Sequence, residues 1–141
     1  MAKKRVFVSF DYENDRHYKN LLSAWDANSN FDFFFNDHSS GEVKTNEVSR
    51  VKAALTTKIN QAEYTIVIVG KYANTQHKDH KEIGYKNWLN FETAKSKLNK
   101  NKLIAIKLQS THVSPDELLN SGAKWAMSFT KEAIIKALES A

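Results

Sequence analysis

The stretch Tyr64-Thr65-Ile66-Val67-Ile68-Val69-Gly70 decides the fold that we expect for this chain. It is a continuous apolar run rich in β-branched residues, a pattern typical of a strand that is buried on both faces. A helical pattern follows Gly84 and begins within the segment Asn87-Trp88-Leu89-Asn90-Phe91-Glu92. A buried strand followed by a helix is the repeating unit of a parallel α/β sheet.

The same alternation of strands and helices runs along the rest of the chain. Strands are predicted over residues 5–10, 31–35, 64–70, 102–108 and 124–129. Helices are predicted after a cap at Asn14 or Asp15 (with Tyr18, Leu21, Leu22 and Trp25 on one face), after Thr45 or Asn46, after Gly84, from Pro115, and over residues 131–140. Five strands in this order predict a flavodoxin-like, doubly wound α/β fold, in which a five-stranded parallel sheet of order 2-1-3-4-5 has helices on both faces.

Length and composition narrow the class of protein. A chain of 141 residues is expected to form a single domain over residues 1–141. No apolar run is long enough for a membrane span, the start does not resemble a signal peptide, and there is no cysteine, so we expect a cytoplasmic protein without disulfides. The net charge of +5 is modest and the aromatic residues lie within apolar runs, which argues against nucleic-acid binding.

The expected strand order places a ligand crevice between the loops that follow the first and third strands. Those loops carry Phe10, Asp11 and Tyr12 on one side and lead to Trp88 and Glu92 on the other. Positions 88 and 92 are one helical turn apart and share a helix face. An indole beside a carboxyl group can stack on a planar ring and can raise the pKa of the carboxyl by desolvation. The alternative is a helix that buries the tryptophan and leaves the glutamate in water.

Several chemistries are excluded by missing motifs. The chain has no GxGxxG, GxxxxGK[ST], GxSxG or HExxH motif, and the group His77, Asp79 and His80 lacks further metal ligands, so we expect no metal site. A receiver domain is excluded because the third strand does not end at an aspartate. One carboxylate with aromatic neighbours suits cleavage of a glycosidic bond whose leaving group is already good, such as a positively charged nicotinamide.

Three segments in this order resemble the TIR (Toll/interleukin-1 receptor) superfamily. They are Arg5-Val6-Phe7-Val8-Ser9-Phe10-Asp11-Tyr12 followed by Asp15, then the run from Tyr64 to Gly70, and then Trp88-Leu89-Asn90-Phe91-Glu92. More narrowly, the chain resembles the bacterial TIR-like branch that supplies the signalling protein of Thoeris anti-phage defence. The resemblance extends from Lys3 to about Phe129 and therefore covers nearly the whole chain.

The resemblance implies an enzyme with NAD as its substrate and no other cofactor. Such proteins sense infection through a phage-derived trigger, cleave the nicotinamide–ribose bond and release a cyclic ADP-ribose isomer that activates an effector protein. Glu92, four positions after Trp88, matches the catalytic glutamate, and Ser9, Phe10 and Asp11 would line the nucleotide pocket. Residues 36–44, including Asn36 and Asp37, would form the loop that gates the site and makes contacts in a homo-oligomer.

The chain departs from this family at one position of the motif. Many TIR enzymes have a serine shortly before the tryptophan, where this chain has Ile83-Gly84-Tyr85-Lys86-Asn87. Two consequences are open: ribose contacts come from Tyr85 or Asn87 instead, or the activity is weak. Two other functions remain open from the sequence: a TIR-like module that mediates assembly without catalysis, and an enzyme of the nucleoside deoxyribosyltransferase type.

Overall fold

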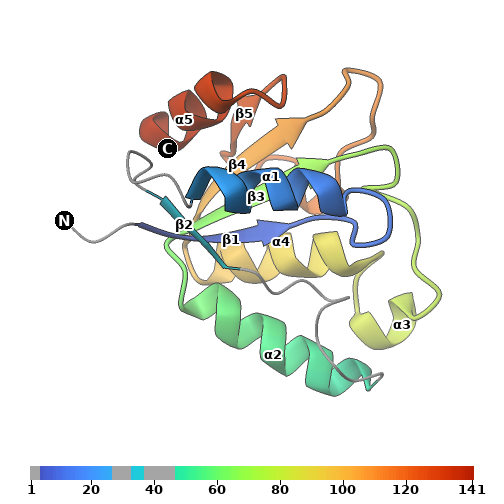
Figure 1. Ribbon diagram of the computed structural model, residues 1–141. Helices are drawn as coiled ribbons and strands as arrows, with labels where there is room; N and C mark the ends of the chain where they lie inside the picture. Colours follow the sequence, from blue (N-terminus) through green and yellow to red (C-terminus); the bar gives the residue numbers. More distant parts are fainter. Residues whose placement is uncertain (1–3, 27–32, 37–46) are drawn as a thin grey trace.

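A five-stranded parallel sheet forms the centre of the computed structural model, which describes residues 4–26, 33–36 and 47–141 (Figure 1). The strands are β1 (Lys4–Ser9), β2 (Phe33–Asn36), β3 (Tyr64–Val69), β4 (Lys102–Lys107) and β5 (Lys124–Ala126). They lie in the order β2-β1-β3-β4-β5, and all four neighbouring pairs are parallel. The predicted fold class and strand order are confirmed.

Helices cover both faces of the sheet, as expected for a doubly wound fold (Figure 1). The helices are α1 (Arg16–Asp26), α2 (Val48–Asn60), α3 (His80–Ile83), α4 (Trp88–Leu98) and α5 (Lys131–Ser140), with a short 3-10 helix η2 (Asp116–Leu118) between β4 and β5. One hydrophobic cluster joins the sheet to α1 and α5, and another joins it to α2, α3 and α4.

Alternation along β1 determines which side chains reach each layer, because successive side chains of a strand point to opposite faces. Val8 packs in the cluster that contains Leu22 of α1, whereas Phe7 packs in the cluster that contains Phe91 of α4. Ser9, two positions after Phe7, therefore points toward α4. β1 thus places the hydroxyl group of Ser9 next to α4, the helix that carries Glu92.

Helix α4 is buried on most of its circumference, and polar bonds as well as apolar contacts fix it on the sheet. The hydroxyl groups of Thr65 and Ser96 lie 2.7 Å apart, and Ser96 Oγ donates to the carbonyl oxygen of Glu92 at 2.8 Å. Asn101 Nδ2 donates to Thr65 Oγ1 at 3.2 Å. These directional bonds fix the helix along its axis, which apolar packing alone does less strictly.

Several predicted boundaries differ from the structure. The helix predicted from Pro115 is only the 3-10 turn η2. Helix α3 lies between the predicted third strand and the helix predicted after Gly84, where no helix was predicted. Leu21 was expected on the buried face of α1 but is 44% exposed, because the contact stripe of this helix is narrow and Leu22 occupies it. The predicted residues 31–32 and 45–46 lie outside the described part of the chain.

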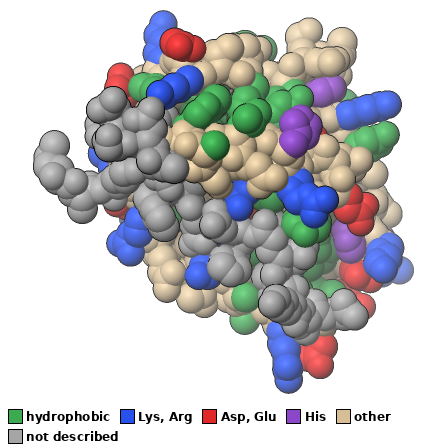
Figure 2. Space-filling model, in the orientation of Figure 1, with side chains coloured by type: hydrophobic (Ala, Val, Ile, Leu, Met, Phe, Trp, Pro, Cys, Tyr) green, Lys and Arg blue, Asp and Glu red, His purple; other side chains and the backbone are tan. Residues whose placement is uncertain are grey.

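Charge is spread over the face of the molecule that Figure 2 shows. Lys and Arg side chains are scattered there between acidic and uncharged groups, rather than gathered in one patch. Each helix in the described ranges is too short or too polar to cross a lipid bilayer.

Candidate functional site

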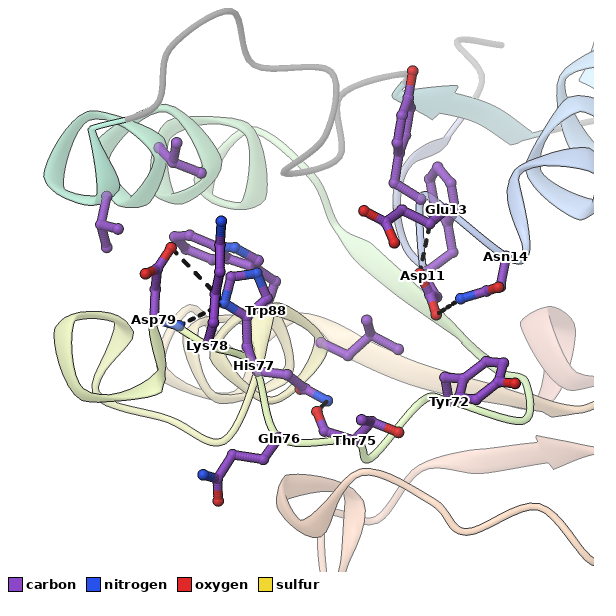
Figure 3. A pocket seen from close by; sticks show the side chains of 16 residues that line it. Asp11, Glu13, Asn14, Tyr72, Thr75, Gln76, His77, Lys78, Asp79 and Trp88 are labelled. Carbon is purple, nitrogen blue, oxygen red and sulfur yellow. Dashed lines mark hydrogen bonds and ion pairs between the residues drawn. The ribbon is translucent and has the colours of Figure 1, made fainter.

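A cavity of about 930 Å³ lies where the chain leaves β1 and β3 (Figure 3). One wall is the loop after β1, and the opposite wall is the segment after β3 together with the start of α4. The lining residues are Phe10, Asp11, Tyr12, Glu13, Asn14, Val48, Val51, Tyr72, Thr75, Gln76, His77, Lys78, Asp79, Asn87, Trp88 and Leu89. This is the crevice that the strand order predicts, and its volume lies in the range of ligand pockets, roughly 300–1,000 Å³.

The wall that follows β1 is a turn held by Asp11. Its Oδ1 accepts from the backbone N–H of Glu13 at 3.1 Å, and its Oδ2 accepts from Nδ2 of Asn14 at 2.7 Å (Figure 3). The backbone N–H of Asp15 donates to the carbonyl oxygen of Asp11 at 2.8 Å and closes the turn. This wall is therefore organised by its own hydrogen bonds.

The opposite wall places a histidine beside the tryptophan of α4. The ring of His77 lies edge-on to Trp88 with 6.4 Å between centroids, and Trp88 lies edge-on to Phe91 at 5.5 Å. His77 Nδ1 accepts from the backbone N–H of Asp79 at 2.9 Å, so a neutral ring carries its proton on Nε2. Trp88 thus lines the cavity and also packs against the hydrophobic cluster beneath α4.

Asn87 connects the start of α4 to the segment after β3. As the N-cap, its Oδ1 accepts from the backbone N–H of Asn90 at 2.9 Å. Its Nδ2 donates to the carbonyl oxygens of Ala73 and Thr75 at 2.9 and 3.0 Å. Both N–H groups of this amide are used, so Asn87 shapes the cavity wall and has no donor left for a ligand.

Two further asparagines extend this connection to the segment after β4. Asn90 Nδ2 donates to Asn74 Oδ1 at 3.0 Å, and Asn90 Oδ1 accepts from the backbone N–H of Glu117 at 2.9 Å. Asn74 Oδ1 also accepts from the backbone N–H of Asp116 at 3.1 Å, and Asn74 Nδ2 donates to Asp116 Oδ1 at 3.0 Å. We refer to Asn74, Asn87 and Asn90 as the asparagine network. It joins the segment after β3, the start of α4 and the segment after β4 at one edge of the cavity.

Glu92 and Ser9 form a buried pair at the end of β1. Ser9 Oγ donates to Glu92 Oε1 at 2.9 Å, and the two side chains are 0% and 1% exposed, respectively. Glu92 Oε2 has no hydrogen-bond partner among the described residues. Burial raises the pKa of Glu92 to about 8, and the bond from Ser9 opposes this rise. In this state the carboxyl group is predominantly neutral at pH 7.

The buried pair lies next to the cavity, and neither residue lines it. Phe10 follows Ser9 in the chain, Leu89 lies three positions before Glu92, and both line the cavity. Reaction at the carboxyl group therefore requires a state in which Glu92 is open to the ligand. The alternative in which the glutamate of this helix stays in water is wrong, because Glu92 is buried.

Residues 7–112, which are 106 of the 141 residues, match the family described as "Thoeris protein ThsB, TIR-like domain". The chain belongs to this family of TIR-like domains.

The chain is similar to the TIR domains in the structure of the activated Roq1 resistosome, described as directly recognizing the pathogen effector XopQ, with 17% identity and a TM-score of 0.47. The match covers 74% of this chain and 57% of that chain, so this chain spans just over half the length of that one. A comparison with curated proteins gave no match.

The site residues predicted for this TIR-like domain fall into four groups. Phe10, Asp11 and Trp88 line the cavity together, and the pair of Ser9 and Glu92 lies beside it. Tyr85 does not line the cavity, because its ring packs edge-on against Phe91 with 5.9 Å between centroids. Of the two residues expected near the ribose, Tyr85 and Asn87, Asn87 is the one that lines the cavity. Asn36 ends β2, but its side chain and the whole of Asp37 lie outside the described residues, as does most of the predicted gating loop.

The wall of the TIR-like cavity between residues 75 and 79 was not predicted residue by residue. The one signal for this wall was a general tendency: long segments without regular structure inside a compact domain are often functional. Within residues 4–26, 33–36 and 47–141, no group of three or more His, Cys, Asp or Glu side chains is placed to hold a metal ion. The role of Asn87 had a usable signal, because an asparagine just before a helical pattern is a typical N-cap.

Proposed function

We propose that this TIR-like domain is an NAD glycohydrolase or cyclase that cleaves the nicotinamide–ribose bond at Glu92. The observation that carries the proposal is the position of this carboxyl group: it is held by Ser9 at the end of β1, on the helix whose first turn lines the cavity. A cavity of about 930 Å³ is large enough for a dinucleotide.

The reaction requires little from the protein beyond a carboxylate placed next to the ribose. The C1′–N bond breaks and nicotinamide leaves as a neutral molecule, taking the electron pair, while positive charge develops on the ribose. An ionised Glu92 next to C1′ stabilises that charge. Attack by water gives ADP-ribose and a proton; attack by a ring nitrogen of the adenine gives a cyclic isomer, again with loss of a proton.

The raised pKa of Glu92 fits a site that is charged only when it is occupied. A cationic nicotinamide ring beside the carboxyl group favours its ionised form and lowers its pKa. The free domain then holds a neutral acid, which tolerates burial, and the complex holds an ion pair. Trp88, which lines the cavity one turn before Glu92, offers an aromatic surface for the departing ring.

The product of this reaction would act as a signal. We propose that the product is a cyclic ADP-ribose isomer that activates an effector protein in Thoeris anti-phage defence, in the cytoplasm where NAD is available. A phage-derived trigger, or association of copies of the chain, would open the buried carboxyl to the substrate. NAD is the substrate in this scheme, and no further cofactor is proposed.

A non-enzymatic assembly module is the second candidate, and one observation favours it. Glu92 is 1% exposed and does not line the cavity, so the state described here is not ready for catalysis. In an assembly module the buried Ser9–Glu92 pair would serve only the packing of α4. Turnover by the wild-type chain decides between the two candidates.

The deciding experiment incubates the purified protein with NAD and follows nicotinamide by chromatography, with deoxyadenosine as a parallel substrate. Glycohydrolase or cyclase activity predicts release of nicotinamide only, and the nucleotide product distinguishes hydrolysis from cyclisation. Release of adenine from deoxyadenosine would instead indicate a deoxyribosyltransferase. Absence of both products at high protein concentration and in lysate from phage-infected cells would support the assembly module.

A further inference from the structure

Two carboxyl oxygens in the described part of the chain are buried without a hydrogen-bond partner: Oε2 of Glu92 and Oδ2 of Asp15. The proposed reaction uses Glu92 and leaves Asp15 without a role. Asp15 is the residue before α1 and is 6% exposed. A carboxyl oxygen buried in this way costs free energy, so the position of this side chain needs a reason.

The carboxyl group of Asp15 lies against the backbone of Gly70, directly after β3. A Cβ atom placed on Gly70 would collide with Cγ, Oδ1 and Oδ2 of Asp15. The φ angle of Gly70 lies outside the left-handed region, so this position needs glycine for space and not for backbone conformation. The loop after β1 and the end of β3 therefore meet through one carboxyl group and one missing side chain.

Asp15 also closes the turn that forms one wall of the cavity. Its backbone N–H donates to the carbonyl oxygen of Asp11. The residues between them, Tyr12, Glu13 and Asn14, all line the cavity, and Figure 3 labels Glu13 and Asn14. A shift of Asp15 away from Gly70 would move this wall relative to β3, and with it the shape of the space that a ligand occupies.

We propose that Asp15 is a positioning residue that seats the cavity wall formed by residues 11–14 on the end of β3. This inference rests on the proposed function for its kinetic consequences, whereas the contact between Asp15 and Gly70 does not depend on that function. Asp15 acts through the wall and has no contact with the reacting bond in this scheme.

The charge of Asp15 determines how firmly it seats the wall. Burial, and then the negative charge of Asp11 in the same loop, raise the pKa of Asp15 from 3.8 to about 6. His17 of α1 and His112 of the segment after β4 oppose the rise, and Gly70 presents only backbone. Because the folded-state pKa is raised, the stabilising contribution of the neutral carboxyl is full below pH 3.8 and is lost as pH rises through 6.

The experiment compares the wild type with Asp15→Asn, Asp15→Ala, Gly70→Ala and the double variant Asp15→Ala/Gly70→Ala. Glu132→Gln, which removes an exposed acid at the start of α5, is the matched control. Melting temperatures are measured from pH 4 to pH 8, and kcat and KM for NAD are measured at pH 6 and pH 7.5.

Four results are expected. The melting temperature of Asp15→Asn rises relative to the wild type as pH increases from 4 to 7, because the amide cannot ionise. Asp15→Ala raises KM at least fivefold with kcat changed less than twofold, and Asp15→Asn restores KM to within twofold. Gly70→Ala lowers the melting temperature. The melting temperature of the double variant falls by less than the sum of the decreases in the two single variants. Glu132→Gln matches the wild type in every measurement.

Three results would overturn the proposal: additive losses in the double variant, an unchanged KM in Asp15→Ala, or a kcat loss that Asp15→Asn does not restore. If the wild type does not cleave NAD, the proposed function fails separately. Calorimetric binding of ADP-ribose then replaces KM, and equal affinity of the wild type and Asp15→Ala, or no binding to either, would also overturn the proposal. The melting comparison still applies in that case.

Discussion

Ser9 Oγ and Glu92 Oε1 lie 2.9 Å apart, and this bond joins residues separated by 83 positions in the chain. It is a contact between the last residue of β1 and the second turn of α4. Among the described residues, Ser9 is the one hydrogen-bond donor to the carboxyl group of Glu92, so the ionisation of this acid is sensitive to the serine.

We expect Glu92→Gln to abolish nicotinamide release, by at least two to three orders of magnitude, because the amide cannot supply the charge that stabilises the ribose cation. The measurement is single-turnover cleavage of NAD by equal amounts of folded protein. Glu132→Gln, an acid on the surface of α5, serves as the control and should retain full activity. Wild-type turnover in Glu92→Gln would exclude this site.

The same substitution should change how stability depends on pH. The folded-state pKa of Glu92 is raised from 4.5 to about 8, so the wild type loses stability relative to Glu92→Gln as pH rises through this interval. Each unit of pKa difference corresponds to about 1.4 kcal/mol. Melting curves from pH 5 to pH 9 test this, and a constant difference between the two proteins would show that the carboxyl group is not buried in solution.

We expect Ser9→Ala to raise the pKa of Glu92 further, because the bond from Ser9 is the contact that lowers it. The rising limb of the activity profile should move to higher pH, and the protein should lose about 1 kcal/mol of stability, typical of one hydrogen bond. Ser128→Ala, which alters an exposed hydroxyl group, is the control. An unshifted pH profile would contradict the assigned bond.

Asn87→Ala should destabilise the protein by about 2 kcal/mol or more, because it removes an N-cap and leaves two carbonyl oxygens without their donor. Thr130→Ala removes the N-cap of α5 alone and should cost about 1 kcal/mol. Urea unfolding of both variants measures the difference. Equal losses would mean that the bonds from Asn87 to the segment after β3 contribute nothing.

Trp88 should show a mixed effect, because it both packs on Phe91 and lines the cavity. Trp88→Ala should cost about 3 kcal/mol of stability and raise the KM for NAD. Trp88→Phe should retain most of the stability and should change KM less, because it keeps an aromatic ring. Urea unfolding and steady-state kinetics on the same preparations separate the two contributions. Unchanged stability and kinetics in Trp88→Ala would mean that the indole faces water and that α4 is wrongly placed.

The fold followed from the sequence because its signals are local. The buried run from Tyr64 and the other strands each carry their own apolar pattern. With five strands that alternate with helices, the rules for connections between parallel strands allow few sheet topologies. The spacing of Trp88 and Glu92 likewise fixed their shared helix face. Short elements were less predictable: α3 and η2 have too few residues for a periodic pattern.

The state of the site was not predictable in the same way, because it depends on contacts between distant residues. The spacing from Trp88 left open whether the carboxyl group of Glu92 is desolvated or in water, and nothing near Glu92 in the chain indicates that its donor is Ser9. The clash between Asp15 and a side chain at position 70 also arises only when two loops meet. Tyr85 was expected at the ligand because of its position before Trp88, yet it packs on Phe91, where an aromatic ring gains more from the cluster than from an open cavity.

The asparagine network gives the site two parts that respond differently to solution conditions. The bonds of Asn74, Asn87 and Asn90 are made mainly by amides, which do not change charge between pH 4 and pH 9. The two buried acids Asp15 and Glu92, which take no part in these bonds, ionise within that interval. The frame at this edge of the cavity should therefore keep its shape while the two acids change charge, so a change of activity with pH would report on Glu92 and on the seating of the opposite wall by Asp15, and not on the asparagine network.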